Sequence, residues 1–354
     1  MVRNRGWLVA GLLSVGLIGL ASCKKEDKAP AASGSGDTKV DPKATAEKPA
    51  PPAGVPSTSK VSPTATGDDL SLLPVDSEVV MGLNFSQLQQ SQLFKQFVEP
   101  LMMKGDFQTK LNEFKTQCGF DPLQAVKTVS IGMKGIGATK PDGVIVVHGA
   151  EKAKVMDCFE KMKAEAKKDA EVTRDGDIII IKSNKGGDTV AFQFVNDTTA
   201  LMVMGANATK DGIKAAAAGT STLKSSAAFV EMYSKINIQD SMWLLMNGNS
   251  KAFDKAAAMG FKPKAVFGSL NVTDGLTLDL RMRLDSADQA TQIAQMGKSQ
   301  AAGAASMFDK LDIVSDGADV KVSIALSNAK LQSLIKQFGG LLGGMGGMGS
   351  MGGP

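Results

Sequence analysis

Short apolar runs, each bounded by turn residues, recur along the chain from residue 79 to residue 326. Each run is long enough only for a strand, and the Asp-Gly and Gly-Gly turns between neighbouring runs favour antiparallel hairpins. Longer stretches with apolar residues at helical spacing separate the hairpins. The pattern therefore predicts an α+β fold made of antiparallel sheet and helices.

The expected elements follow the same order in both halves of this region. In the first half, we expect strands over 79–84, 126–133, 144–148, 178–181, 189–195 and 200–204, with helices over 88–116 (broken at Pro100), 151–168, 208–218 and 225–236. In the second half, we expect strands over 243–246, 265–272, 276–284, 311–315 and 320–326, with helices over 250–259, 288–308 and 328–338.

Three short sequence matches in the same order indicate an internal duplication. They are Asp76-Ser77 with Asp240-Ser241, Gly119-Phe120-Asp121-Pro122 with Gly260-Phe261-Lys262-Pro263, and Asp175-Gly176 with Asp316-Gly317. The sequence thus predicts two duplicated units, residues 69–236 and 237–338, each with an antiparallel sheet and helices packed on one face. The two sheets could join or pack against each other.

Both ends of the chain differ in composition from this body. Residues 24–68 are rich in Lys, Asp, Pro, Ala, Gly, Ser and Thr, and such a stretch buries too little apolar surface to offset its ordering entropy. Residues 339–354 are mostly Gly and Met, and repeated Gly disfavours helix and strand. We expect a disordered linker over 23–68 and a disordered tail over 339–354, with a Met-rich contact as the alternative for the tail.

The first 22 residues have the order of a secretory signal peptide. Arg3 and Arg5 precede an uncharged apolar run from Leu8 to Leu20. This run is shorter than the roughly 20 apolar residues that a membrane-spanning helix needs, so a cleaved signal is the better interpretation.

The run ends in Leu20-Ala21-Ser22-Cys23, a tetrad that resembles the lipobox of bacterial lipoproteins. The resemblance implies that Cys23 becomes the first mature residue, carries acyl chains and anchors the protein to a membrane of the cell envelope. Lys24 follows Cys23 where an Asp would favour the inner membrane in enterobacteria, so the outer membrane is expected, on either leaflet. The alternatives are an ordinary signal peptide with a chance Cys, or an uncleaved anchor.

Two further resemblances cover only short segments of the chain. The Gly/Met tail is similar in composition to the tail of large bacterial chaperonins. The segment Leu73-Pro74-Val75-Asp76-Ser77 resembles the start of uncharacterised envelope lipoproteins and implies no activity.

With Cys23 assigned to lipid, Cys118 and Cys158 remain as a pair in an oxidising compartment. We predict a disulfide between them. The alternative is two free buried thiols.

The motifs of common catalytic and metal sites are missing from the sequence. There is no Gly-x-Ser-x-Gly elbow, and the only histidine, His148, ends an apolar strand. Without clustered His and Cys ligands no metal site is predicted, and no cofactor either. The small net positive charge and few aromatic residues do not favour nucleic acid. We therefore expect no enzyme.

Many expected strands carry methionine: Met81, Met133, Met202, Met204, Met242, Met246 and Met282. These side chains can fill gaps in an ordinary core or line a site for varied apolar ligands. The leading prediction is a membrane-anchored envelope lipoprotein with a non-enzymatic binding or structural role, in contact with an envelope protein or an apolar ligand. One alternative is a carrier or sensor of an apolar ligand such as lipid, and a second is an envelope hydrolase.

Overall fold

The computed structural model describes residues 69–334, apart from 103–105, 137–140, 167–169, 185–187, 251–252 and 254–261. Cys23, the signal peptide, the linker, the Gly/Met tail and most of the helix expected over 250–259 lie outside this range. Within it, no helix has the length and apolar character needed to cross a membrane.

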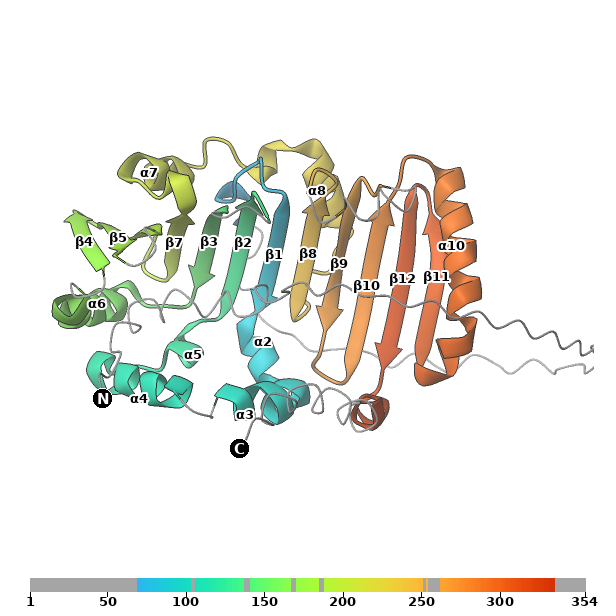
Figure 1. The fold of residues 1–354 in the computed structure, drawn as a ribbon, viewed down its shortest axis with the longest axis horizontal. Helices are drawn as coiled ribbons and strands as arrows, with labels where there is room; N and C mark the ends of the chain where they lie inside the picture. The colour runs from blue at the N-terminus through green and yellow to red at the C-terminus, as the bar shows by residue number, and fades with distance from the viewer. Residues whose placement is uncertain are drawn as a thin grey trace, which may run out of the picture.

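Twelve strands form one antiparallel sheet, in the order β11-β12-β10-β9-β8-β1-β2-β3-β7-β6-β5-β4 (Figure 1). The strands are β1 (Val79–Asn84), β2 (Thr128–Lys134), β3 (Asp142–His148), β4 (Ala170–Asp175), β5 (Ile178–Ser183), β6 (Thr189–Phe194), β7 (Thr199–Met204), β8 (Met242–Asn247), β9 (Ala265–Asn271), β10 (Leu276–Arg283), β11 (Lys310–Asp316) and β12 (Asp319–Leu326).

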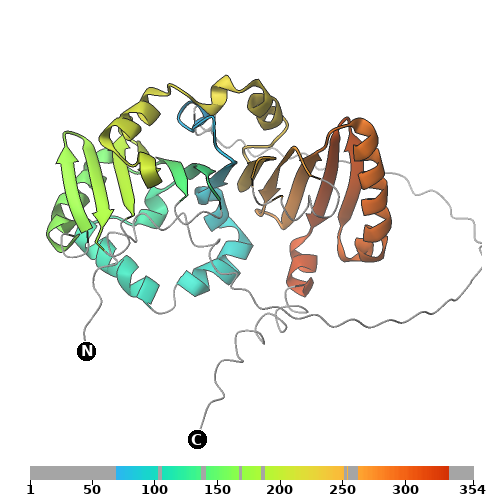
Figure 2. The same cartoon turned by 45° about the horizontal axis from the view of Figure 1, so that its top comes forward.

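Helices connect the strands at both borders of the sheet. They are α2 (Phe85–Gln90), a π-helical turn η2 (Phe94–Val98), α3 (Glu99–Met102), α4 (Asp106–Cys118), α5 (Pro122–Ala125), α6 (Lys152–Ala166), α7 (Lys210–Ala218), α8 (Ala227–Ser234) and α10 (Ala287–Ala301), with short 3-10 turns η1 (Asp69–Ser71), η3 (Gly205–Asn207), η4 (Leu223–Ser225) and η6 (Ala302–Met307). Figure 2 shows α7 and α8 on one side of the sheet and α2, α3 and α4 on the other.

The α+β class is confirmed, but the two halves of the chain share a single sheet. The first strand of each half meets the other at the centre, where β1 and β8 pair antiparallel from Val79–Met246 to Leu83–Met242. Over the whole sheet, helices lie on both faces, because α8 packs on one and α10 on the other. The duplication itself stays a prediction, and the first half has two strands more than the second.

The main core lies on the side of α7 and α8. Val80, Leu245 and Phe267 point to this side from three neighbouring strands, and each is fully buried. Ile213 of α7 and Phe229 of α8 belong to the same buried cluster. We call this side of the sheet the core face.

A glycine permits the close packing at the junction of the halves. Gly82 of β1 lies directly opposite Trp243 of β8, and a Cβ atom on Gly82 would overlap the indole ring. The indole is 2% exposed and makes an edge-on contact with Tyr233 of α8, at 5.2 Å between ring centroids. The missing side chain therefore lets one large ring cover both central strands.

The structure confirms most of the strands expected from the sequence, β1 with the bounds predicted. One strand, β4, was missed, because its sequence Ala-Glu-Val-Thr-Arg-Asp is polar and lies at the edge of the sheet. The expected long helix over 88–116 is wrong in detail. It divides into α2, η2, α3 and α4. The break expected at Pro100 is also wrong, because η2 continues directly into α3, and Pro100 is the second residue of α3.

The predicted disulfide is confirmed. Cys118 at the end of α4 is bonded to Cys158 in α6, with 4.6 Å between the Cα atoms. Phe114 and Met162 are buried beside it, and Phe114 meets Phe120 edge-on. This small cluster joins two helices that share little other apolar surface with the main core.

Substitution of Gly82 tests the junction. Gly82→Ala should lower the free energy of unfolding by about 1–3 kcal/mol, because the added methyl group displaces the Trp243 ring. Urea unfolding followed by tryptophan fluorescence measures the change. Gly303→Ala is the matched control, since a Cβ there meets no atom within 4 Å. Equal stability of the two variants would contradict this account.

Candidate functional site

The side of the sheet opposite the core face is apolar across nine neighbouring strands, from β6 to β12. The strand registers place the following residues on it: Val190, Phe192, Phe194, Ala200, Met202, Met204, Gly143, Ile145, Val147, Val129, Ile131, Met133, Val79, Met81, Leu83, Met242, Leu244, Met246, Val266, Gly268, Leu270, Leu276, Leu278, Leu280, Met282, Val320, Val322, Ile324 and Leu326. We call this surface the Met face.

All seven strand methionines singled out in the sequence lie on the Met face. Met81 lies beside Leu244 and Ile131, and Met246 lies beside Val79 and Val266. Nine strands at the usual spacing of 4.7–4.9 Å span about 38 Å. The apolar residues therefore run without a break across that width.

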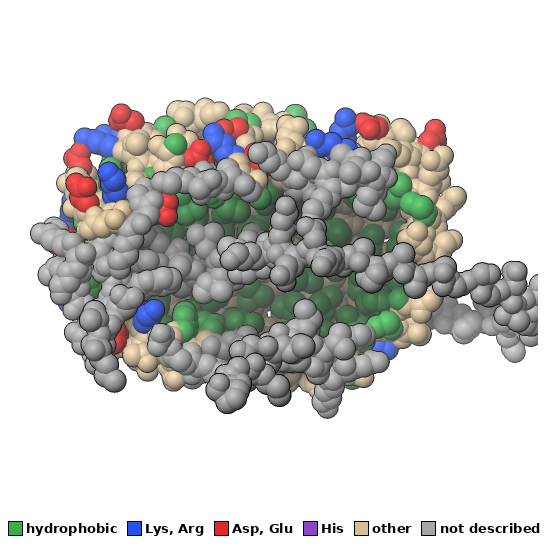
Figure 3. Space-filling view, viewed as in Figure 1, with side chains coloured by type: hydrophobic (Ala, Val, Ile, Leu, Met, Phe, Trp, Pro, Cys, Tyr) green, Lys and Arg blue, Asp and Glu red, His purple; other side chains and the backbone are tan. Residues whose placement is uncertain are grey.

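Burial separates the two faces most clearly in the central strand β8. Trp243 and Leu245 on the core face are 2% and 0% exposed, whereas Met242, Leu244 and Met246 on the Met face are half-buried. The same holds for Met81 and Leu83 of β1. Figure 3 shows hydrophobic side chains across the middle of the sheet, with charged side chains at its borders.

Helix α10 covers one end of the Met face. Ala290 and Ala294 are buried against Val320, with Met282 and Ile313 beside them. At the other end of this face, Ile131, Met133, Ile145 and Met202 form a buried cluster. Half-buried positions run through the middle of the face on β1, β8, β9 and β10. They also occur on the outer strands of the face, at Val129, Val147, Val190, Phe192, Met204, Val322 and Ile324.

On the core face, β10 and β12 carry charges in place of apolar residues. Arg283 donates from Nε to Asp319 Oδ1 at 2.7 Å and from Nη2 to Glu231 of α8 at 3.1 Å. Lys235 binds both acids, at 3.1 Å from Asp319 and 2.9 Å from Glu231. These ion pairs connect α8 to β10 and β12, next to the apolar core.

The charged cluster shifts the pKa values of its members. Hydrogen bonds from Arg283, against the opposing effect of burial, lower the pKa of Glu231 to about 2. Burial alone would raise the pKa of Asp319, but hydrogen bonds from Arg283 and Lys235 outweigh it and lower that pKa. The side chain of Asp319 is only 2% exposed, so its charge depends on these partners.

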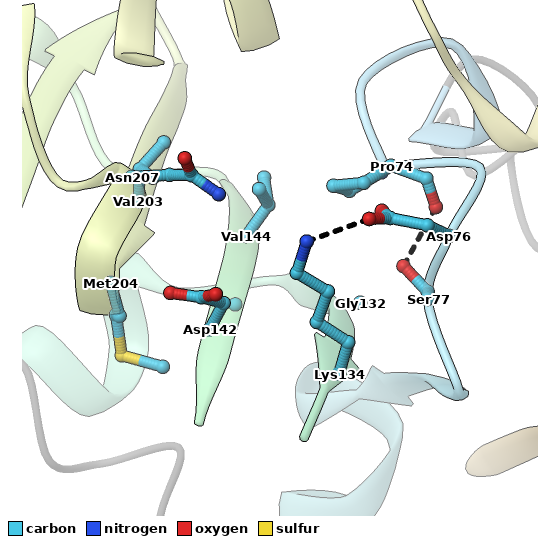
Figure 4. Close-up of a pocket in the computed structure, with 11 residues that line it drawn as sticks. Pro74, Asp76, Ser77, Gly132, Lys134, Asp142, Val144, Val203, Met204 and Asn207 are labelled. Atoms are coloured by element: carbon cyan, nitrogen blue, oxygen red, sulfur yellow. Dashed lines mark hydrogen bonds and ion pairs between the residues drawn. The ribbon is translucent and has the colours of Figure 1, made fainter. Parts of the chain in front are cut away.

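A small hollow opens where β2, β3 and β7 meet η3 (Figure 4). Lys134 forms an ion pair with Asp76 at 2.7 Å, and this hydrogen bond raises the pKa of Lys134. Asp142 Oδ1 accepts from the amide of Ala206 at 2.6 Å, and Ser77 donates to the carbonyl of Pro74. Lys134, Asp142 and Ser77 thus each have a hydrogen-bond partner within the protein.

The single histidine, His148, has two side-chain partners that could not be predicted from the sequence. His148 ends β3, with Nε2 2.7 Å from Asp69 Oδ1 and Nδ1 3.1 Å from Thr199 Oγ1. The order of acid, imidazole and hydroxyl resembles a catalytic triad, but Thr199 is 5% exposed and Asp69 is 1% exposed. A buried hydroxyl has no access to substrate, so the arrangement fastens η1 to β3 and β7.

Among the described residues, no group of three or more His, Cys, Asp or Glu is arranged to hold a metal ion. No protein-family model, curated protein or solved structure matches the chain. The Met face is therefore the candidate functional site, on its chemistry alone.

The charged cluster predicts a stability that depends on acid. A folded pKa of about 2 for Glu231, against an unfolded value of ~4.3, stabilises the fold above pH 4.3, and this contribution is lost as the pH falls towards 2. Glu231→Gln should therefore lower the free energy of unfolding by at most about 1 kcal/mol at pH 7, because water screens a partly exposed pair.

The difference between wild type and Glu231→Gln should shrink as the pH falls from 5 to 2.5, measured by urea unfolding. Glu151→Gln, which removes an exposed ion pair with Lys154, controls for the loss of one carboxylate. A difference that stays constant with pH would rule out the role assigned to Glu231.

Proposed function

We propose that this chain is a lipid-anchored protein of the cell envelope that binds the hydrocarbon chains of lipids on its Met face. The observation that supports the proposal is the set of residues that the strand register places on this face. Across nine neighbouring strands, every side chain on that face is apolar, and no hydroxyl, amide or charge interrupts it.

The chemistry of the Met face favours hydrocarbon over a polar ligand. A ligand with hydrogen-bonding groups would leave them unsatisfied against these side chains, at a cost in free energy. A hydrocarbon chain loses nothing by leaving water and gains about 0.8 kcal/mol for each buried methylene. The face therefore selects for long apolar ligands without selecting a headgroup.

Methionine supports ligands of varied shape. Its unbranched side chain has three rotatable bonds and a polarisable sulfur, so it adapts to different partners at little cost. Met81, Met242 and Met246 are half-buried on the central strands β1 and β8. The buried core-face positions of the neighbouring strands carry less adaptable side chains, such as Val80, Leu245 and Phe267.

Anchoring through Cys23 would place this surface near its ligands. The composition of residues 24–68 favours a flexible linker, and a flexible coil of about 45 residues reaches roughly 35–40 Å. The body would then sample the space next to the bilayer without leaving the membrane.

A charge placed in the Met face should weaken the binding of hydrocarbon chains. Leu244→Glu sets a carboxylate in the middle of β8 and should weaken binding of a fluorescent long-chain fatty acid by roughly tenfold or more. Fluorescence titration measures the affinity, and far-UV circular dichroism checks the fold.

Val230→Glu is the matched control, because Val230 is 41% exposed on α8, away from the Met face. The control should bind the probe as wild type does. Absence of probe binding to the wild-type protein, or equal binding to all three, would refute the proposed function.

Anchoring has its own test. In a bacterial host, Cys23→Ser should lose the acyl chains and move from the detergent phase to the aqueous phase on Triton X-114 partitioning, because several acyl chains are needed for firm membrane binding. Lys24→Ala, one residue outside the tetrad, should stay in the detergent phase. Wild-type protein found in the aqueous phase would disprove lipidation at Cys23.

A further inference from the structure

We propose that the Gly/Met tail, residues 339–354, occupies the Met face in the absence of ligand and is displaced when a hydrocarbon chain binds. This inference rests on the proposed function for its second half only. Its first half, contact between tail and sheet, stands on composition and distance.

The tail begins close to the surface that it would cover. Strand β12 ends at Leu326, which lies on the Met face, and residues 328–334 form a short helix at the border of the sheet (Figure 1). Leu331 of this helix is buried, at 9% exposure, and Lys330 binds the carbonyl of Phe308 at 2.7 Å. The chain therefore leaves the sheet at a fixed point beside the Met face.

The remaining chain is long enough to reach the half-buried centre. From β12 to β1 there are four strand spacings, or about 19 Å. A flexible coil of the length of residues 335–354 has a root-mean-square span of roughly 25 Å. Because the span matches the distance, the effective concentration of the tail at the face is high.

The composition of the tail suits the Met face, and that of the linker does not. Residues 339–354 contain Leu341, Leu342, Met345, Met348 and Met351 and no charged residue. The linker over 24–68 carries Lys, Asp and Glu throughout, and burying those charges would be costly. The tail is thus the terminal segment whose side chains can leave water without penalty.

Glycine makes this contact weak and reversible. Each Gly loses more conformational freedom on ordering than any other residue, which offsets much of the gain from burying Leu and Met. Because the Met face is broad, the backbone amides of the tail can stay in contact with water. A covalently attached, weakly held occupant protects the apolar surface from aggregation and yields to a ligand that binds more tightly.

Photocrosslinking tests the contact directly. A photoreactive benzoylphenylalanine replaces Met348 in the full chain, and mass spectrometry identifies the crosslinked residues after irradiation. Crosslinks within one chain to β1, β8, β9 or β10 support the proposal. Crosslinks between two chains, or to other surfaces only, overturn it, the former in favour of a second copy as occupant.

Ligand affinity tests the competition. Replacing Met345, Met348 and Met351 by Ser should tighten binding of the fluorescent fatty acid, on the order of tenfold if the tail blocks nine faces in ten. The matched control replaces Val40, Val55 and Val61 of the linker by Ser and should leave affinity unchanged. Unchanged affinity in the tail variant overturns the displacement by ligand.

The two proposals fail in different ways. If the Met face binds no hydrocarbon, neither the wild type nor the tail variant binds the probe, while the crosslinks can still form. If only the tail proposal is wrong, the wild type binds the probe with the affinity of the tail variant, and the crosslinks to the sheet are missing.

Discussion

The antiparallel pairing of β1 with β8 is the contact on which the rest of the structure depends. It joins the two halves of the chain into one sheet, so that every strand from β4 to β11 shares the same two faces. Gly82 and Trp243 make this pairing compact, because the indole occupies the space that a side chain on β1 would fill. Without the pairing, each half would have an unprotected central edge and an apolar surface of half the width.

A shared register has a second consequence, because side chains alternate strictly between the faces of a sheet. Runs such as Met242-Trp-Leu-Leu-Met246 are apolar on both sides, a pattern typical of strands buried between two layers. Here Tyr233 of α8 packs on Trp243, and Trp243 and Leu245 are buried on the core face, while Met242 and Met246 on the other side stay half-buried. The Met face thus results from a sheet whose two faces are both apolar.

On the core face, the residues change from apolar to charged near the end of α8. Where α8 ends, Arg283 and Asp319 replace the apolar residues of β8 and β9, and Glu231 and Lys235 complete the set. Hydrogen bonds from Arg283 and Lys235 lower the pKa of both acids. The ion pairs therefore stabilise the fold at neutral pH and are lost as the acids become protonated. On the Met face of the same strands, Met282 and Val320 pack against α10.

The sequence by itself determined the α+β class, nearly all the strands and the disulfide, because these depend on local periodicity and on the count of cysteines. It named the seven methionines but did not show that they share a surface, since the face of a residue depends on register between strands far apart in the chain. It also missed β4, whose polar edge sequence lacks an apolar period. Only the tertiary structure placed Asp69 beside His148, joined the two sheets into one and set the methionines on a single face, because each of these results from long-range pairing.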